Sequence, residues 1–191
     1  MSELVAVDLQ PDMLEELLTR AKMRGLKTTG VVGRWPEVAP KTPAVDVAVC
    51  HHVLYNVPEI VPFVEALDQH ARRRVVIELT TAHPLTGLNP LWRYFHQLQR
   101  PERPTWRDAV AALRASGLDP RVEHSRRGAA RSTMATFEDV VRMTRLRLCL
   151  DDSREAEVVA ELGKIGVRPE DSTTWSLGSP DVVTLWWDSG R

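Results

Sequence analysis

The segment that decides the fold is Asp46-Val47-Ala48-Val49-Cys50-His51-His52-Val53-Leu54-Tyr55-Asn56-Val57. Its apolar, β-branched first half gives way to polar and aromatic residues, which is typical of a buried strand that ends at the edge of a sheet. A helix-spaced apolar pattern begins after Pro58, so the segment reads as strand, turn and helix. Repeated along a chain, this order predicts a mainly parallel sheet covered by helices.

The same order recurs on both sides of this segment. Upstream, the apolar run Leu4–Val7 ends at Asp8, and a helix-spaced series then continues to Gly25, which is placed to end a helix. Thr28–Val32 is expected to form the next strand. Further strands are expected downstream, over Arg74–Leu79, Arg121–His124 and Val182–Trp187.

Composition limits the class of protein. A length of 191 residues favours a single domain over residues 1–191. The net charge of −1 favours neither nucleic acid nor an anionic membrane as a partner, and no apolar run approaches the ~20 residues that span a bilayer. Cys50 and Cys149 lie far apart and in no metal-like spacing, so we expect no metal site and a cytoplasmic location.

Three stretches together carry a resemblance to a known family: Val5-Ala6-Val7-Asp8, Asp12-Met13-Leu14 and the segment Asp46–Val57. They resemble the class I (Rossmann-like) S-adenosylmethionine-dependent methyltransferases. That family has an acid after its second strand, a Met-Leu-like pair in the next helix, and a fourth strand of the form Asp-Val-aliphatic followed by a polar or His pair. The resemblance covers nearly the whole chain. It implies a three-layer α/β sandwich whose last strand is antiparallel.

The resemblance also implies S-adenosylmethionine as cofactor, methyl transfer to a small-molecule acceptor, and roles at the strand ends. Asp8 would hold the ribose hydroxyls and Leu9 would lie beside the adenine, although an acid at this place is equally consistent with a helix cap. Many members of the family have an acidic residue near the adenine at the position of Arg34 and Trp35. Because this chain has no acid there, recognition of the adenine would rest on backbone groups or on stacking against Trp35. The strand tip at Cys50–His52 would lie under the methionine portion.

The adjacent residues His51 and His52 invite a metal or general-base interpretation. On an extended segment they point in opposite directions, so they cannot easily ligate one metal together. Methyl transfer to an already nucleophilic acceptor depends mainly on positioning, and we assign no catalytic residue. The candidates for the substrate side are Tyr55, His83, Tyr94 and His96.

Two segments are expected to be inserts. Residues 81–104 are irregular, proline-rich and aromatic, and exceed the ~2–6 residues of a plain strand–helix connection, so we expect a lid over the carboxyl edge of the sheet. Residues 129–166 should form helices before the last strand. The second of these helices is expected to run through Val158, Val159 and Leu162.

The front of the chain departs from the family. Nothing before Leu4 supplies the family's first strand and its Gly-x-Gly turn, and no Gly-x-Gly occurs in the sequence. We therefore expect a truncated, N-terminally incomplete sheet in which Leu4–Val7 and Val45–Cys50 are not hydrogen-bonded to each other. Weak or absent cofactor binding should follow. A second copy of the chain could fill the opening, so a homo-oligomer is a further expectation.

Two other classes of function are left open by the sequence. The absence of a Gly-rich turn fits a non-catalytic methyltransferase-like module used for binding or dimerisation. A nicotinamide-dependent dehydrogenase also places an acid after its second strand, but no Tyr-x-x-x-Lys pair begins at Tyr55 or Tyr94.

Overall fold

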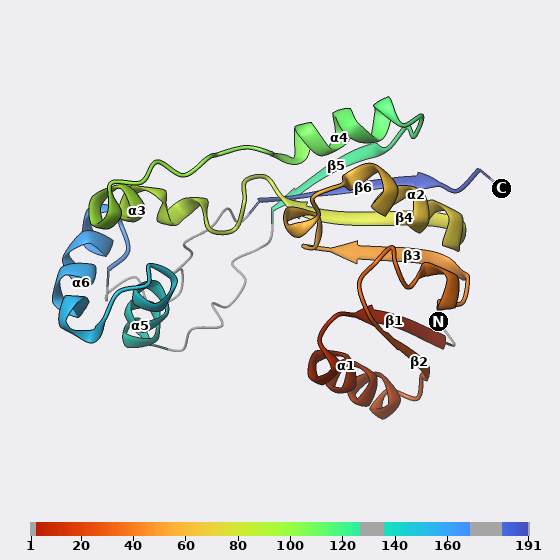
Figure 1. Cartoon of the computed structure of the whole chain (residues 1–191), viewed down its shortest axis with the longest axis horizontal. Helices are drawn as coiled ribbons and strands as arrows, with labels where there is room; N and C mark the ends of the chain where they lie inside the picture. Colours follow the sequence, from red (N-terminus) through yellow and green to blue (C-terminus); the bar gives the residue numbers. More distant parts are fainter. Residues whose placement is uncertain (1–2, 127–135, 169–180, 191) are drawn as a thin grey trace. The chain divides into compact units, whose positions relative to one another are not determined.

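The computed structural model describes residues 3–126, 136–168 and 181–190 (Figure 1). The strands are β1 (Glu3–Asp8), β2 (Lys27–Val32), β3 (Val45–His51), β4 (Ala71–Thr80), β5 (Arg121–Arg126) and β6 (Asp181–Asp188). The α-helices are α1 (Pro11–Met23), α2 (Ile60–His70), α3 (Asn89–His96), α4 (Trp106–Ala115), α5 (Phe137–Arg147) and α6 (Glu155–Lys164). Short 3-10 helices are η1 (Ala39–Lys41), η2 (Leu54–Asn56), η3 (Thr86–Leu88) and η4 (Asp152–Arg154).

The strands form two sheets. β1 and β2 pair in parallel over their whole length, with Ala6 opposite Gly30. The other sheet has the strand order β3-β4-β6-β5. β1 and β3 are therefore not hydrogen-bonded to each other, as the sequence predicts. Among the described residues, each of these two strands has one edge without a pairing strand.

The last strand, β6, runs antiparallel to β4, which confirms the prediction made for it. The Thr81 amide, just after β4, donates to the Asp181 carbonyl at the start of β6 (3.0 Å). At the other end, the Ser189 amide, just after β6, donates to the Arg73 carbonyl near the start of β4 (3.0 Å). Only strands of opposite direction allow both bonds.

Proline and glycine define α1 and its packing. Pro11 occupies the first turn, where its missing N–H costs no hydrogen bond. Gly25, at φ +76°, ends the helix, and its amide bonds to the Lys22 carbonyl (2.8 Å). In β2, a Cβ on Gly30 would lie 2.6 Å from Cδ1 of Leu18, so glycine at this position allows α1 to approach the sheet closely.

The two faces of the β3–β4 region differ in burial. Val75 and Ile77 of β4 are fully buried. The buried residues of α2, which contacts β3, are Phe63, Val64 and Leu67. Val47 and Val49 of β3 point to the other side and are 46% and 58% exposed. This apolar face therefore lacks the cover that a parallel sheet normally has on both sides.

The chain divides into two compact units. The first comprises Met1–Ile77, Val110–Val122 and Leu185–Arg191, and the second comprises Glu78–Ala109 and Glu123–Thr184. In the second unit, α3, α5 and α6 enclose one hydrophobic core (Figure 1). Its fully buried members are Leu88, Leu91, Val140, Leu148, Val158 and Leu162. The two predicted inserts therefore pack together as one helical body, which the sequence did not predict.

The helix expected through Val158, Val159 and Leu162 is present as α6, and its neighbouring valines differ in burial. Val158 and Leu162 are fully buried, but Val159 is 38% exposed. Because successive residues are about 100° apart on a helix, Val159 turns away from the core that its neighbour enters.

Candidate functional site

Asp8 ends β1 and begins the turn into α1. Its main-chain carbonyl accepts a hydrogen bond from the Gly33 amide (2.9 Å), which joins the ends of β1 and β2. Its Oδ1 accepts from the Gln10 amide (2.8 Å), just before α1. The side chain is exposed. Since an ionised carboxylate has about four acceptor positions, this turn contact leaves room for a ligand. Leu9, beside it, is 56% exposed.

The turn after β2 has room only for glycine at its first position. Gly33 adopts φ +150°, and a Cβ there would lie 2.2 Å from Cγ1 of Val38. The following Arg34 is exposed, and its Nε lies 3.8 Å from Oε1 of Glu37. Asp8 and the Gly33 turn thus lie together at the carboxyl end of the β1–β2 pair, where open α/β sheets bind ligands.

Trp35 is held against α2. Its indole N–H donates to the Phe63 carbonyl (3.0 Å), and its ring meets the His70 ring edge-on, with 4.9 Å between centroids. The His70 ring also lies 2.7 Å from the Ala39 carbonyl. These contacts fix the loop after β2 onto α2. Adenine stacking by Trp35 stays a prediction, and the indole already has this structural role.

The tip of β3 begins with a buried thiol. Cys50 is 6% exposed, and burial raises the pKa of its thiol to about 12, against a smaller lowering by a backbone hydrogen bond from Val53. The thiol is therefore protonated at neutral pH. It can line a pocket as a small apolar group, but it cannot serve as a thiolate nucleophile.

His51 is exposed, whereas His52 is partly buried and lies in a strained backbone conformation at φ 56°. A non-glycine residue seldom adopts this conformation, and such residues are concentrated at functional sites. The His52 ring lies nearly parallel to the Tyr55 ring, with 6.4 Å between centroids and 10° between planes. The structure therefore brings together two of the residues that the sequence analysis singled out.

His83 lies in the second unit, just after β4. Its Nδ1 accepts a hydrogen bond from the Leu85 amide (3.1 Å), so the proton of the neutral ring is on Nε2. Partial burial, followed by the positive charge of Arg100, lowers the pKa of His83 below its ordinary value. The Nδ1 lone pair is therefore already used within this turn, and a substrate role for His83 stays a prediction.

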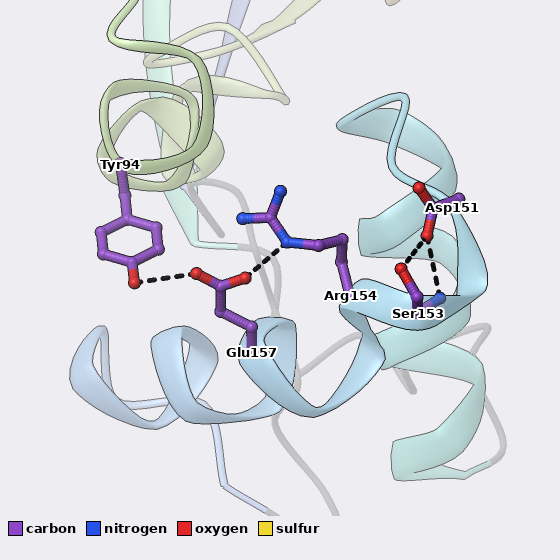
Figure 2. Close-up of polar contacts among 5 residues, drawn as sticks. All are labelled: Tyr94, Asp151, Ser153, Arg154 and Glu157. Carbon is purple, nitrogen blue, oxygen red and sulfur yellow. Dashed lines mark hydrogen bonds and ion pairs between the residues drawn. The ribbon is translucent and has the colours of Figure 1, made fainter.

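Tyr94 and His96 both have partners within the helical body. Figure 2 shows the Tyr94 hydroxyl donating to Oε1 of Glu157 (2.9 Å), while Arg154 binds the other oxygen of the same carboxylate. The hydrogen bond and the negative charge of Glu157 raise the pKa of the Tyr94 phenol. The His96 Nε2 donates to the Leu148 carbonyl (2.7 Å). These contacts join α3 to α5 and α6, and a substrate role for either residue stays a prediction.

The described ranges contain no cluster of three or more His, Cys, Asp or Glu residues that could hold a metal ion. Within the same ranges, no helix is long and apolar enough to cross a membrane.

Comparison with known proteins gives similar structures but no similar sequences. A scan against profiles of protein families and a search of curated proteins found no match. Among solved structures, a Bacillus halodurans protein described as a candidate methyltransferase is 12% identical, with a TM-score of 0.54 over 100% of this chain and 84% of that one. A cyclopropane-fatty-acyl-phospholipid synthase-like protein from Lactobacillus casei is 11% identical, with a TM-score of 0.53 over 96% and 74%.

A third similar structure contains a bound ligand. Magnesium protoporphyrin IX methyltransferase from Synechocystis, determined with S-adenosylhomocysteine, is 17% identical, with a TM-score of 0.50 over 64% of this chain and 57% of that one. At these identities the likeness shows the fold. The chain has the mixed α/β, Rossmann-like fold of the class I methyltransferases.

Proposed function

We propose that this chain forms an S-adenosylmethionine-dependent methyltransferase domain that acts on a small-molecule acceptor. The observation that carries the proposal is Asp8, an exposed carboxylate at the carboxyl end of β1, in a strand arrangement of parallel β1 and β2 and antiparallel β6. The nearly balanced charge of the chain supports a small acceptor rather than nucleic acid.

The residues at the carboxyl ends of the strands fit this cofactor. Asp8 would accept hydrogen bonds from both ribose hydroxyls, because its carboxylate is exposed and only Oδ1 bonds to the turn. The exposed Leu9 would lie along the adenine, and the Gly33 turn keeps β2 close beside Asp8. The protonated Cys50 and the partly buried His52 would lie next to the methionine portion of the cofactor.

When bound, the cofactor supplies a methyl group on a positively charged sulfur, and the acceptor lone pair takes that methyl as the carbon–sulfur bond breaks toward sulfur. This chain's residues would position the two partners in line and exclude water, which supplies much of the rate in such transfers. The proton lost by the acceptor would leave to solvent. No described side chain is required to remove it.

The affinity of this chain for the cofactor should be low. Charge-assisted hydrogen bonds to Asp8 contribute about 1.5–3 kcal/mol each, whereas micromolar binding needs about 8 kcal/mol in total. The family's Gly-rich turn, which would add backbone contacts at the methionine end, has no counterpart in the sequence. We therefore expect a dissociation constant between about 10 μM and 1 mM.

Equilibrium dialysis with S-adenosylhomocysteine tests the site. Asp8→Ala should weaken binding at least about tenfold, because two charge-assisted hydrogen bonds are lost. Glu15→Ala is the matched control, since it removes an exposed carboxylate of α1 and should leave binding unchanged. Absence of saturable binding at millimolar ligand, or equal binding by wild type and Asp8→Ala, would contradict the proposal.

A non-catalytic module is the second candidate, favoured by the missing Gly-x-Gly turn. Incubation with methyl-labelled S-adenosylmethionine and a panel of small nucleophilic acceptors separates the two. Label transfer that Asp8→Ala abolishes supports the enzyme. Binding that depends on Asp8 without any transfer across the panel supports the module.

A further inference from the structure

Two hydrogen-bond donors of α3 are buried without an acceptor. The indole N–H of Trp92 and the side-chain amide nitrogen of Asn89 are both buried, and neither has a hydrogen-bond partner among the described residues. The two residues are one turn apart, so their side chains leave the helix on the same side. Because buried polar groups in folded proteins nearly always have a partner, two such donors on one side of a helix indicate a missing acceptor.

A positive charge without a counter-ion lies over the same indole. The guanidinium carbon of Arg100 is 5.2 Å from the centroid of the Trp92 ring. Arg100 is partly buried, and no carboxylate of the described residues forms an ion pair with it. Its charge also reaches His83, since burial and then the charge of Arg100 lower the pKa of that imidazole. The guanidinium therefore lies close to both Trp92 and His83.

An arginine together with unpaired N–H donors matches a carboxylate. A water molecule could accept hydrogen bonds from the two N–H groups, but it would leave Arg100 without a counter-ion. A carboxylate meets both needs, because its oxygens accept from neutral donors and also pair with a guanidinium. His83 adds little positive charge, since its lowered pKa favours the neutral ring. One uncompensated arginine therefore suits the single charge of a carboxylate better than the charge of about −1.5 to −2 on a phosphate monoester.

We propose that Asn89, Trp92 and Arg100 form a binding site for the carboxylate group of a small organic acid. Trp92 and Arg100 are both partly exposed, which gives the ligand a way in from solvent. All three residues belong to the second compact unit, whereas Asp8 belongs to the first. The carboxylate site therefore goes beyond the proposed methyl transfer, and either proposal can fail without the other.

NMR of the full ¹⁵N-labelled chain, with sodium acetate as the probe, tests this site. The indole N–H of Trp92 gives a signal of its own, which is assigned by its loss in Trp92→Phe. Acetate at pH 7 should shift this signal saturably, with half-saturation between about 1 and 30 mM. Sodium chloride at equal ionic strength is the reference, because it screens charges equally without supplying a carboxylate. Sodium phosphate at the same pH should bind more weakly than acetate.

Two variants remove the proposed contacts one at a time. Arg100→Gln should raise the acetate dissociation constant at least about tenfold, because the charge-assisted hydrogen bonds are lost. Trp92→Phe keeps an aromatic ring but removes the N–H, and should raise the constant about threefold or more, read from the Asn89 side-chain amide signal.

A second arginine–tryptophan pair of the same unit supplies matched controls. Arg107 lies over the Trp106 ring at 4.4 Å, but the Trp106 N–H is not a buried donor without a partner. Arg107→Gln and Trp106→Phe should therefore bind acetate like wild type. The proposal would be overturned by no saturable shift up to about 100 mM acetate, by a response that chloride reproduces, or by binding unchanged in Arg100→Gln. Phosphate binding at least as tight as acetate binding would overturn the assignment to a carboxylate.

Discussion

At the scale of single residues, the two cysteines differ enough to be distinguished chemically. Cys50 is buried and its thiol pKa is raised to about 12, whereas Cys149 is exposed. Only the thiolate reacts with alkylating reagents. At about pH 8, N-ethylmaleimide should therefore label Cys149 of the folded protein much faster than Cys50, as peptide mass mapping would measure. In denaturant the two rates should converge; equal rates in the folded protein would contradict the burial of Cys50.

Asp108 should make stability depend on acid pH. Its carboxylate binds Arg103 and accepts hydrogen bonds from the amide (2.7 Å) and hydroxyl (2.9 Å) of Thr105. These contacts, led by that with Arg103, lower the pKa of Asp108 from its ordinary value of 3.8. A lowered folded-state pKa gives stability that is complete above about pH 4 and is lost as the pH falls further.

Urea unfolding between about pH 2.5 and 6 measures this effect. Asp108→Asn cannot ionise, so its free energy of unfolding should fall less steeply below about pH 4 than that of wild type. Asp119→Asn is the control, because the Asp119 side chain is 94% exposed, and its profile should follow wild type. Parallel profiles for wild type and Asp108→Asn would show that the contacts of Asp108 do not favour its ionised form.

The sequence could identify Asp8 and the tip of β3 because their signals are local: a polar residue directly after an apolar run. It could not predict the contact of Trp35 with the Phe63 carbonyl, since those residues are 28 positions apart and only folding brings them together. Glu157 was also missed. Its spacing from Arg154 suggests an ordinary helical ion pair, and the contact with Tyr94 adds a partner 63 positions away.

At the scale of elements, α6 offers a matched pair of neighbouring valines. Val158 is fully buried in the core of the helical body, whereas Val159 is 38% exposed. Val158→Ala should lower the free energy of unfolding by about 2 kcal/mol through lost burial and a cavity, and Val159→Ala by about 0.5 kcal/mol or less. Denaturant titration of both variants checks the order. A larger loss for Val159→Ala would contradict the packing of α6.

Element types were predictable, and several boundaries were not. Gly25 marks the end of α1 in sequence and structure alike, because its effect is local. The strand expected over Arg74–Leu79 is longer in the structure, because α2 ends at His70 and β4 begins directly after it and runs over Ala71–Thr80. Arg74 also has partners from the far end of the chain that no local pattern reveals: an ion pair with Asp188 (2.7 Å) and a contact with the Trp186 ring, both on β6.

At the scale of the whole molecule, the described strands form two separate sheets, β1-β2 and β3-β4-β6-β5. The order of strands expected from the sequence resembles that of a known family, except that the family's first strand has no counterpart. That strand normally lies between the strands that correspond to β1 and β3, so we could predict that β1 and β3 are not hydrogen-bonded to each other. The structure confirms this. The helical body could not be predicted in the same way. Its core joins residues 88–91 to residues 140–167, and no local pattern reveals that two separate inserts share one interior.

An S-adenosylmethionine-type cofactor is proposed to bind at the carboxyl ends of β1, β2 and β3, and a residue-by-residue measurement can locate it. Titrating the ¹⁵N-labelled chain with S-adenosylhomocysteine, while following its amide signals by NMR, tests this most directly, because weak binding is visible residue by residue. Saturable shifts are expected at the amides of Leu9, Gln10, Gly33 and residues 50–53, with none in α6, and these shifts should be lost in Asp8→Ala. Shifts confined to other parts of the chain, or no shifts at millimolar ligand, would contradict it.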